Sequence, residues 1–128
     1  GSFQYLFFRL AEQCPIKVVP GVSSLMSCSA SLSQPLSARN DILSILPAPL
    51  PDPTLKACLQ VADTAAIIKI GRHFSRIRKL LKLMKLEQKS HYIERSTLPN
   101  EKIRNLNNVN PAEEPYFSMI LVQRRGKI

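Results

Sequence analysis

The segment at residues 65–84 most strongly limits what this chain can fold into. Residues 65–70 (Ala-Ala-Ile-Ile-Lys-Ile) are almost entirely apolar, which is typical of a strand buried on both faces of a sheet, and Gly71 ends it. The residues that follow place one set of apolar side chains on a single helical face, with basic residues opposite: Phe74, Ile77, Leu80, Leu81 and Met84. A buried strand followed by an amphipathic helix that docks on the sheet predicts an α/β fold.

The remaining elements follow from apolar periodicity and from breaks at Pro and Gly. They are helices at 3–13, 24–33 and 54–61, and strands at 16–19, 42–46, 90–94, 102–107 and 116–123. The helix at 24–33 is rich in Ser and Ala, which favours close packing against a sheet. Because strands first alternate with helices and then follow one another, we expect a mixed sheet with flanking helices.

The composition argues against several classes of protein. The chain has 128 residues, of which 45% are hydrophobic, so it can bury a core and is not generally disordered. It contains no long apolar run, and we expect no membrane partner. Its three cysteines lack Cys-x-x-Cys spacing, and His73 and His91 have no paired ligands nearby, so we expect neither a disulfide framework nor a metal site. A reducing, cytoplasmic setting is expected.

The net charge of +9 has a local cause. Most of the excess lies in one basic stretch: Lys69, Arg72, Arg76, Arg78, Lys79, Lys82, Lys85 and Lys89. Such a stretch attracts anions such as nucleic acid, an acidic membrane surface or a polycarboxylate. The alternative, which we favour for most of these residues, is a solvated helix face.

Residues 20–24 (Pro-Gly-Val-Ser-Ser) indicate a strand end, a glycine turn and a helix start that Ser23 or Ser24 can cap. A crevice at the carboxyl end of such a strand offers backbone N–H groups and hydroxyls to a polar ligand. Farther along, Arg39, Asn40 and Asp41 follow a Pro-Leu turn. An arginine fork suits carboxylates, and we expect Asp41 to hold Arg39 or a loop N–H.

These motifs, in this order, resemble the tetrapyrrole (corrin/porphyrin) methylases, which use S-adenosylmethionine. Residues 38–41 (Ala-Arg-Asn-Asp) and 70–73 (Ile-Gly-Arg-His) are similar to members that methylate carbon 20 of precorrin-2 in cobalamin biosynthesis. The family's Gly-Asp-Pro loop is absent. The resemblance therefore implies that residues 1–14 are a connecting helix from a missing N-terminal domain. Residues 15–128 would be the C-terminal α/β domain of the tetrapyrrole methylase fold.

The resemblance also implies a set of site residues. Those expected to contact S-adenosylmethionine are Ser23, Ser24, Ile70, Gly71, Ser96, Phe117 and Ser118. Those expected to face the tetrapyrrole substrate are Arg39, Asn40 and His73. No residue is implied as a catalytic acid or base, and Glu94 is expected only to anchor its loop.

The implied activity is transfer of a methyl group from S-adenosylmethionine to carbon 20 of precorrin-2 or of its cobalt-bearing equivalent. Displacement at a sulfonium methyl needs chiefly alignment and desolvation. The intact enzyme is expected to be a homodimer, and this portion alone is expected to be inactive and to bind cofactor weakly. Two alternatives stay open. One is methylation at another ring position. The other is a non-enzymatic nucleic-acid-binding module on the basic helix, although the interleaved exposed aromatics of single-strand binders are missing.

Overall fold

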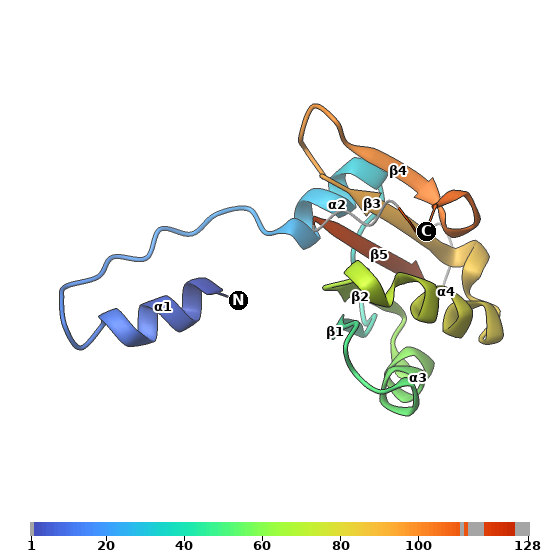
Figure 1. Cartoon of the computed structure of the whole chain (residues 1–128), viewed down its shortest axis with the longest axis horizontal. Helices are drawn as coiled ribbons and strands as arrows, with labels where there is room; N and C mark the ends of the chain where they lie inside the picture. Colours follow the sequence, from blue (N-terminus) through green and yellow to red (C-terminus); the bar gives the residue numbers. More distant parts are fainter. Residues whose placement is uncertain (1, 111, 113–116, 125–128) are drawn as a thin grey trace.

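The computed structural model describes residues 2–110, 112 and 117–124 (Figure 1). Its longer helices are α1 (Ser2–Leu10), α2 (Ser24–Leu32), α3 (Asp52–Val61) and α4 (Phe74–Leu83). Short 3₁₀ turns occur at η1 (Gly71–His73), η2 (Glu87–Lys89) and η3 (Leu106–Asn108). The strands are β1 (Leu43–Pro47), β2 (Thr64–Ile68), β3 (Ser90–Glu94), β4 (Lys102–Asn105) and β5 (Ser118–Gln123). The predicted α/β class is confirmed.

The strands form one mixed sheet in the order β1-β2-β5-β3-β4. β1 and β2 are parallel, whereas β5 is antiparallel to both of its neighbours, β2 and β3, and β4 is antiparallel to β3. The strands β1, β2 and β3 therefore run in one direction, and their carboxyl ends share one edge of the sheet. β5 begins at that edge, since Ser118 pairs with Glu94 at the end of β3.

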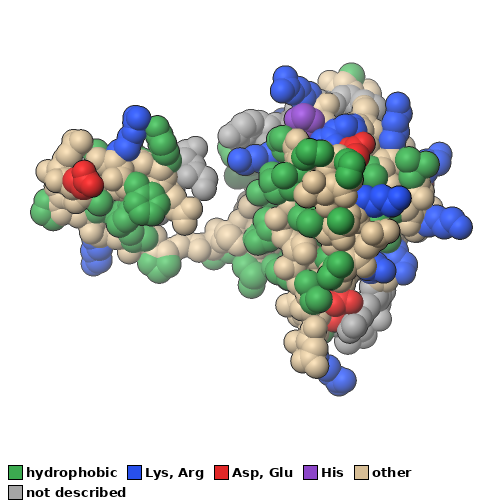
Figure 2. All heavy atoms as spheres, turned by 90° about the horizontal axis from the view of Figure 1, so that it is seen from below, with side chains coloured by type: hydrophobic (Ala, Val, Ile, Leu, Met, Phe, Trp, Pro, Cys, Tyr) green, Lys and Arg blue, Asp and Glu red, His purple; other side chains and the backbone are tan. Residues whose placement is uncertain are grey.

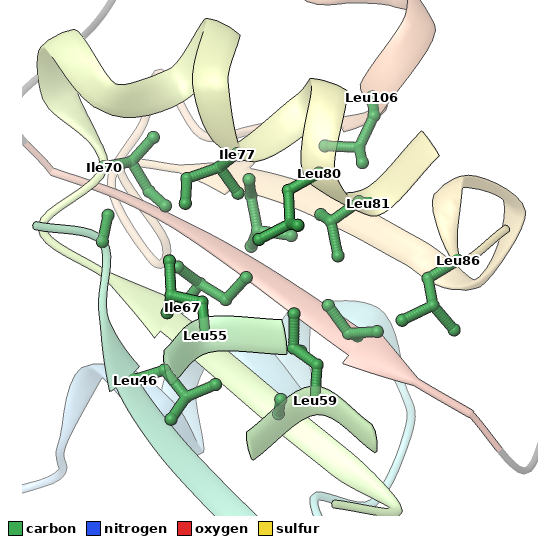
Figure 3. Packing of buried hydrophobic residues seen from close by; sticks show 14 of the residues in the cluster. Leu46, Leu55, Leu59, Ile67, Ile70, Ile77, Leu80, Leu81, Leu86 and Leu106 are labelled. Atoms are coloured by element: carbon green, nitrogen blue, oxygen red, sulfur yellow. The ribbon is translucent and has the colours of Figure 1, made fainter. Parts of the chain in front are cut away.

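Helices cover both faces of the sheet. α3 and α4 pack on one face, where buried side chains of the two helices meet Ala65, Ile67 and Ile120 in the larger apolar cluster. Figure 3 shows apolar side chains of α3 and α4 directed toward the strands. α2 lies on the opposite face, where Cys28 joins the smaller cluster with Ile93 and Leu121. The small side chains of α2 allow this close approach, as its composition predicted.

Most elements form where the sequence pattern indicated, although the strand predicted at 102–107 ends at Asn105 and gives way to η3. In α4 the buried residues are four of the predicted apolar stripe: Phe74, Ile77, Leu80 and Leu81. The fifth, Met84, is the C-cap of the helix and packs against this core while only partly buried. Ser23 is the N-cap of α2, and its hydroxyl accepts a hydrogen bond from Met26 N at 3.4 Å, which confirms the predicted capping. The strand predicted at 116–123 is present as β5, although Tyr116 lies outside the described residues.

The predicted strand at 16–19 is wrong. Residues 15–23 have no regular secondary structure and are exposed, with Val19 at 77% and Val22 at 84%. A strand needs a hydrogen-bonded neighbour, and none of the described strands pairs with this segment. The predicted helix at 3–13 ends earlier, at Leu10, and Figure 1 shows α1 standing apart from the sheet.

The proline-rich loop between β1 and α3 is attached to α4 by one side chain. The Arg76 guanidinium donates to the carbonyl of Leu50 at 3.2 Å, to the carbonyl of Ala48 and to the carboxylate of Asp52. This holds the loop over the end of β1, next to the sheet edge described above. Within the described part of the chain, no helix is long and apolar enough to cross a membrane.

Candidate functional site

A cavity of about 760 Å³ opens at the shared carboxyl edge of the sheet. This is the place where open α/β sheets bind ligands, and the volume lies in the range of small-molecule sites. The first turns of α2 form one wall, and the chain after β2, the chain after β3 and the start of β5 form the others. Its lining residues are Ser24, Ser27, Cys28, Pro49, Ile68, Lys69, Ile70, Gly71, Arg72, His73, Ile93, Arg95, Ser96, Leu98, Phe117, Ser118 and Met119.

The two serines at the start of α2 have different positions. Ser23 uses its hydroxyl to cap the helix and does not line the cavity, whereas Ser24 does. Ser27 and Cys28 lie one turn farther along the same face and extend this wall. The sequence prediction named the first pair and missed the second, although the helical spacing from Ser24 was the signal that could have found it.

The chain leaving β2 turns sharply at the cavity. Lys69 has φ +58° and Gly71 has φ +36°, so two residues in three adopt the left-handed region. A Cβ added at Gly71 would meet no atom within 4 Å, which means that the glycine faces open space beside the cavity. The side chain of Ile70, by contrast, is 1% exposed and belongs to the core beneath α4.

The chain leaving β3 is held in an equally unusual conformation. Arg95 has φ +50° and Thr97 has φ +66°, and between them Ser96 lines the cavity. The backbone N–H of Arg95 donates to the carbonyl of Phe117 at 2.8 Å, which ties this segment to the start of β5. Non-glycine residues with positive φ persist only where surrounding contacts offset the strain, and in proteins they are often found at binding sites.

A hydrogen-bonded cluster joins this segment to α2. The hydroxyls of Ser96 and Ser31 are 3.0 Å apart, and Ser31 donates to Glu101 Oε2 at 2.7 Å. The same carboxylate oxygen accepts the backbone N–H of Thr97 at 2.6 Å. The Ser31 hydrogen bond first, and then that from Thr97, lower the pKa of Glu101 below its ordinary value.

The cavity is apolar at its base and cationic at its rim. Ile68, Ile93 and Met119 belong to the cluster under α2, while Lys69, Arg72 and Arg95 bring positive charge. Among the described residues that line the cavity, none is Asp or Glu. The nearby Glu94 is 3% exposed and lies 3.8 Å from Arg95 Nη1 and 3.6 Å from Lys102 Nζ, in keeping with its expected anchoring role.

Cys28 is buried on the wall formed by α2. Burial is the main reason that the pKa of its thiol is raised, and the neighbouring Ser96 hydroxyl acts in the opposite direction. The thiol is therefore protonated and unreactive, and it packs as a small apolar group. Among the described residues, no group of His, Cys, Asp and Glu side chains is arranged to hold a metal ion.

The structure brings together most, but not all, of the predicted site. The predicted residues that line the cavity are Ser24, Ile70, Gly71, His73, Ser96, Phe117 and Ser118. Arg39 and Asn40 do not, because they lie in the turn before β1, at the opposite edge of the sheet. In that turn Asp41 Oδ2 accepts the backbone N–H of Ala38 at 3.0 Å, as expected of a residue that holds a loop N–H.

Comparison with known proteins agrees with this architecture. A sequence profile of the tetrapyrrole (corrin/porphyrin) methylases matches residues 1–109. The chain is 34% identical over 122 residues to a precorrin-2 C(20)-methyltransferase of Sinorhizobium sp, covering 95% of this chain and 50% of that protein. It is 32% identical over 125 residues to a cobalt-precorrin-2 C(20)-methyltransferase of Salmonella typhimurium, covering 94% and 53%. The chain thus spans about half the length of these curated relatives.

Solved structures show the same fold. The methyltransferase CobJ superposes with a TM-score of 0.66 at 18% identity, covering 94% of this chain and 57% of CobJ. The uroporphyrin-III C-methyltransferase from Thermus thermophilus, solved in complex with S-adenosylhomocysteine, gives 0.63 at 22% identity, covering 94% and 58%. Since the family profile matches most of the chain and the sheet has the family's fold, the chain belongs to the tetrapyrrole (corrin/porphyrin) methylases.

Proposed function

We propose that this chain is part of an S-adenosylmethionine-dependent methyltransferase that methylates carbon 20 of precorrin-2 or of cobalt-precorrin-2 in cobalamin biosynthesis. The two curated relatives that carry these names support the ring position and the substrate class. The observation that carries the proposal is the cavity itself, which collects six of the seven residues expected to contact the cofactor.

The residues around the cavity fit S-adenosylmethionine. The open space beside Gly71 leaves room for a ligand against the backbone, and Ser24 and Ser96 offer hydroxyls. Phe117, which is largely exposed, offers an aromatic face at the start of β5. When bound, the cofactor supplies an electrophilic methyl group on its sulfonium.

The residues of this chain would act by aligning the reactants and by excluding water from them. The apolar base of Ile68, Ile93 and Met119 excludes water from the cavity, and the hydroxyls orient the ligand. We assign no acid or base, since alignment is the main requirement of such a transfer. His73 stays a proposed substrate contact at the rim.

The cationic rim supports a polycarboxylate substrate. Lys69, Arg72 and Arg95 line the cavity, and guanidinium groups bind carboxylates in a forked geometry. Arg95 also lies 3.8 Å from the carboxylate of Glu94, so Lys69 and Arg72 are the stronger candidates for contact with the substrate. These three residues were not predicted as substrate contacts. Arg39 and Asn40 remain proposed contacts, although their turn lies at the far edge of the sheet.

We also propose that residues 1–14 connect the sheet domain to an N-terminal domain of the same enzyme, and that the intact enzyme is a cytoplasmic homodimer. The connecting role is supported by exposed apolar surface. Phe8 of α1 is largely exposed, and so are Val19 and Val22 of the following segment. Figure 2 shows apolar side chains spread over the separate α1 lobe. Such surface favours contact with further protein. For the compartment, the support is that the three cysteines are unpaired.

Calorimetric titration with S-adenosylhomocysteine tests the proposed cofactor site. We compare the wild-type chain with Ser24→Leu, which fills the cavity wall, and with Ser75→Leu, a matched control on the exposed side of α4. We expect saturable, weak binding that Ser24→Leu abolishes and Ser75→Leu preserves. Equal binding by Ser24→Leu would contradict the placement of the cofactor.

A parallel titration with a short DNA duplex tests the rival nucleic-acid-binding module, which would use exposed lysines such as Lys79, Lys82 and Lys89. Salt-sensitive duplex binding without any response to S-adenosylhomocysteine would favour that module. If neither S-adenosylhomocysteine nor the duplex binds, the same titration is repeated on the longer polypeptide. Assay of that polypeptide with precorrin-2, followed by location of the new methyl group, distinguishes carbon 20 from another ring position.

A further inference from the structure

Glu101 lies behind the wall of the cavity and connects two of its sides. It precedes β4 and is not among the lining residues, yet its carboxylate accepts hydrogen bonds from Ser31 of α2 at 2.7 Å and from Thr97 N at 2.6 Å. Ser31 has one hydroxyl hydrogen and donates it to Glu101. In the 3.0 Å contact between the hydroxyls of Ser31 and Ser96, Ser96 is therefore the donor. A continuous chain of hydrogen bonds therefore runs from the lining residue Ser96 to Glu101.

The segment that Glu101 holds has a strained backbone, which is closed into a turn by the hydrogen bond from Leu98 N to Arg95 O at 3.0 Å. Arg95 and Thr97 both have positive φ, a conformation that costs roughly 1–3 kcal/mol at a non-glycine residue and persists only where surrounding contacts impose it. At one end the contact is Arg95 N to Phe117 O. At the other end it is Thr97 N to Glu101. Between these two restraints, Ser96 is presented to the cavity.

We propose that Glu101 is a positioning residue of the cavity: its carboxylate fixes the segment 95–98 against α2, and so sets where Ser96 meets the ligand. The identity of that ligand, S-adenosylmethionine, rests on the proposed function. The positioning role itself rests only on the contacts of Glu101. It was not predicted from the sequence, because Glu101 is 70 residues from Ser31 along the chain.

The charges around Glu101 are consistent with an ionised carboxylate in this role. The pKa of Glu101 is lowered chiefly by the Ser31 hydrogen bond. On α2 the facing titratable group is Cys28, whose own pKa the carboxylate helps to raise. On the loop, Arg95 and Lys102 are both drawn toward Glu94.

The first test monitors the backbone amides of the segment 95–98 directly, without any ligand. In ¹H–¹⁵N spectra of the wild-type chain, we expect the Thr97 amide to be shifted downfield and to titrate with a midpoint below pH 4.5, the ordinary value for the Glu101 carboxyl. In Glu101→Gln the titration should vanish while the other amides stay in place. In Glu101→Ala the Thr97 and Ser96 amides should lose protection from exchange. Unchanged Thr97 and Ser96 amides in Glu101→Ala would overturn the proposal.

The second test measures what the wall does for the ligand. We expect Glu101→Ala to weaken S-adenosylhomocysteine binding about tenfold, the usual loss for a hydrogen bond to a charged group, and Glu101→Gln to restore part of it. Glu87→Ala, a carboxylate in η2 outside the cavity, should bind like the wild-type chain. If wild-type and Glu101→Ala bind equally, the positioning role is wrong and the proposed function stands. If the wild-type chain does not bind, the comparison is repeated on the longer polypeptide, and the amide measurements decide the role of Glu101 in this chain.

Discussion

Left-handed residues gather where two strands leave the sheet for the cavity. Lys69 and Gly71 follow β2, and Arg95 and Thr97 follow β3. At three of these positions a side chain is kept in a conformation that glycine adopts more easily. Four of the seven described residues with positive φ therefore lie at these two strand exits, where the path of the chain determines which backbone groups face the cavity.

Gly71 is the position where this strain can be tested by adding a single methyl group. Gly71→Ala meets no atom within 4 Å but must adopt φ +36°, so we expect the free energy of unfolding to fall by about 1 kcal/mol. Gly21→Ala also meets no atom, without a positive φ, and should be neutral or slightly stabilising. Urea denaturation of both variants checks this; equal effects at the two sites would argue against backbone strain.

His91 on β3 gives the chain a pH dependence near neutrality. Burial lowers the pKa of its imidazole below 6.5, so the unfolded chain binds a proton more readily than the folded chain. The free energy of unfolding should therefore decrease as the pH falls below 6.5. Replacing His91 by Gln should flatten that slope in urea titrations at several pH values. An unchanged slope would assign the dependence to other groups.

Among the elements, α4 shows how well apolar periodicity predicts packing. Its stripe was predicted from the sequence, and the structure places it in the core, where Ile77, Leu80 and Leu81 point toward the sheet (Figure 3). Leu81 is 0% exposed, whereas Leu83 on the same helix is 82% exposed. The strand at 16–19 has an equally apolar pattern and did not form. Periodicity describes one segment, whereas a strand also needs a neighbour that the segment cannot specify.

The two leucines of α4 make a matched pair. Leu81→Ala should lower the free energy of unfolding by about 2–5 kcal/mol, since it leaves a cavity in the core. Leu83→Ala removes the same atoms from the surface and should change stability by less than about 0.5 kcal/mol. Chemical denaturation of the two variants provides the measurement. Similar losses would contradict the orientation of the helix.

The site could be predicted only in part for a related reason. Residues next to recognisable motifs, such as Ser24, Gly71 and Ser96, were found through resemblance to the family. Lys69 and Arg95 were missed even though they adjoin predicted residues. Glu101 was missed because only the fold brings it to Ser31, which is 70 residues away along the chain. Arg39 and Asn40 stand next to a turn that the sequence could locate along the chain but not at an edge of the sheet.

At the scale of the whole molecule, the sheet domain and the segment before it are separate in their packing. Among the described residues, neither apolar cluster contains a residue before Leu25. Removal of residues 1–14 should therefore change the free energy of unfolding of the sheet domain by less than about 0.5 kcal/mol in urea denaturation. A loss well above that would show that α1 packs on the sheet domain and is not a connector.

The position of β5 has a consequence for how this molecule is made. β5 is the last described strand along the chain, yet it lies between β2 and β3 in the sheet. During synthesis, the facing edges of β2 and β3 have no partner until residues 118–123 emerge from the ribosome. Folding is then governed by contacts between distant parts of the chain, which are slow to form and leave apolar edges open to association. The nascent chain is therefore most vulnerable to aggregation just before β5 is synthesised, the strand that completes both the sheet and the cavity.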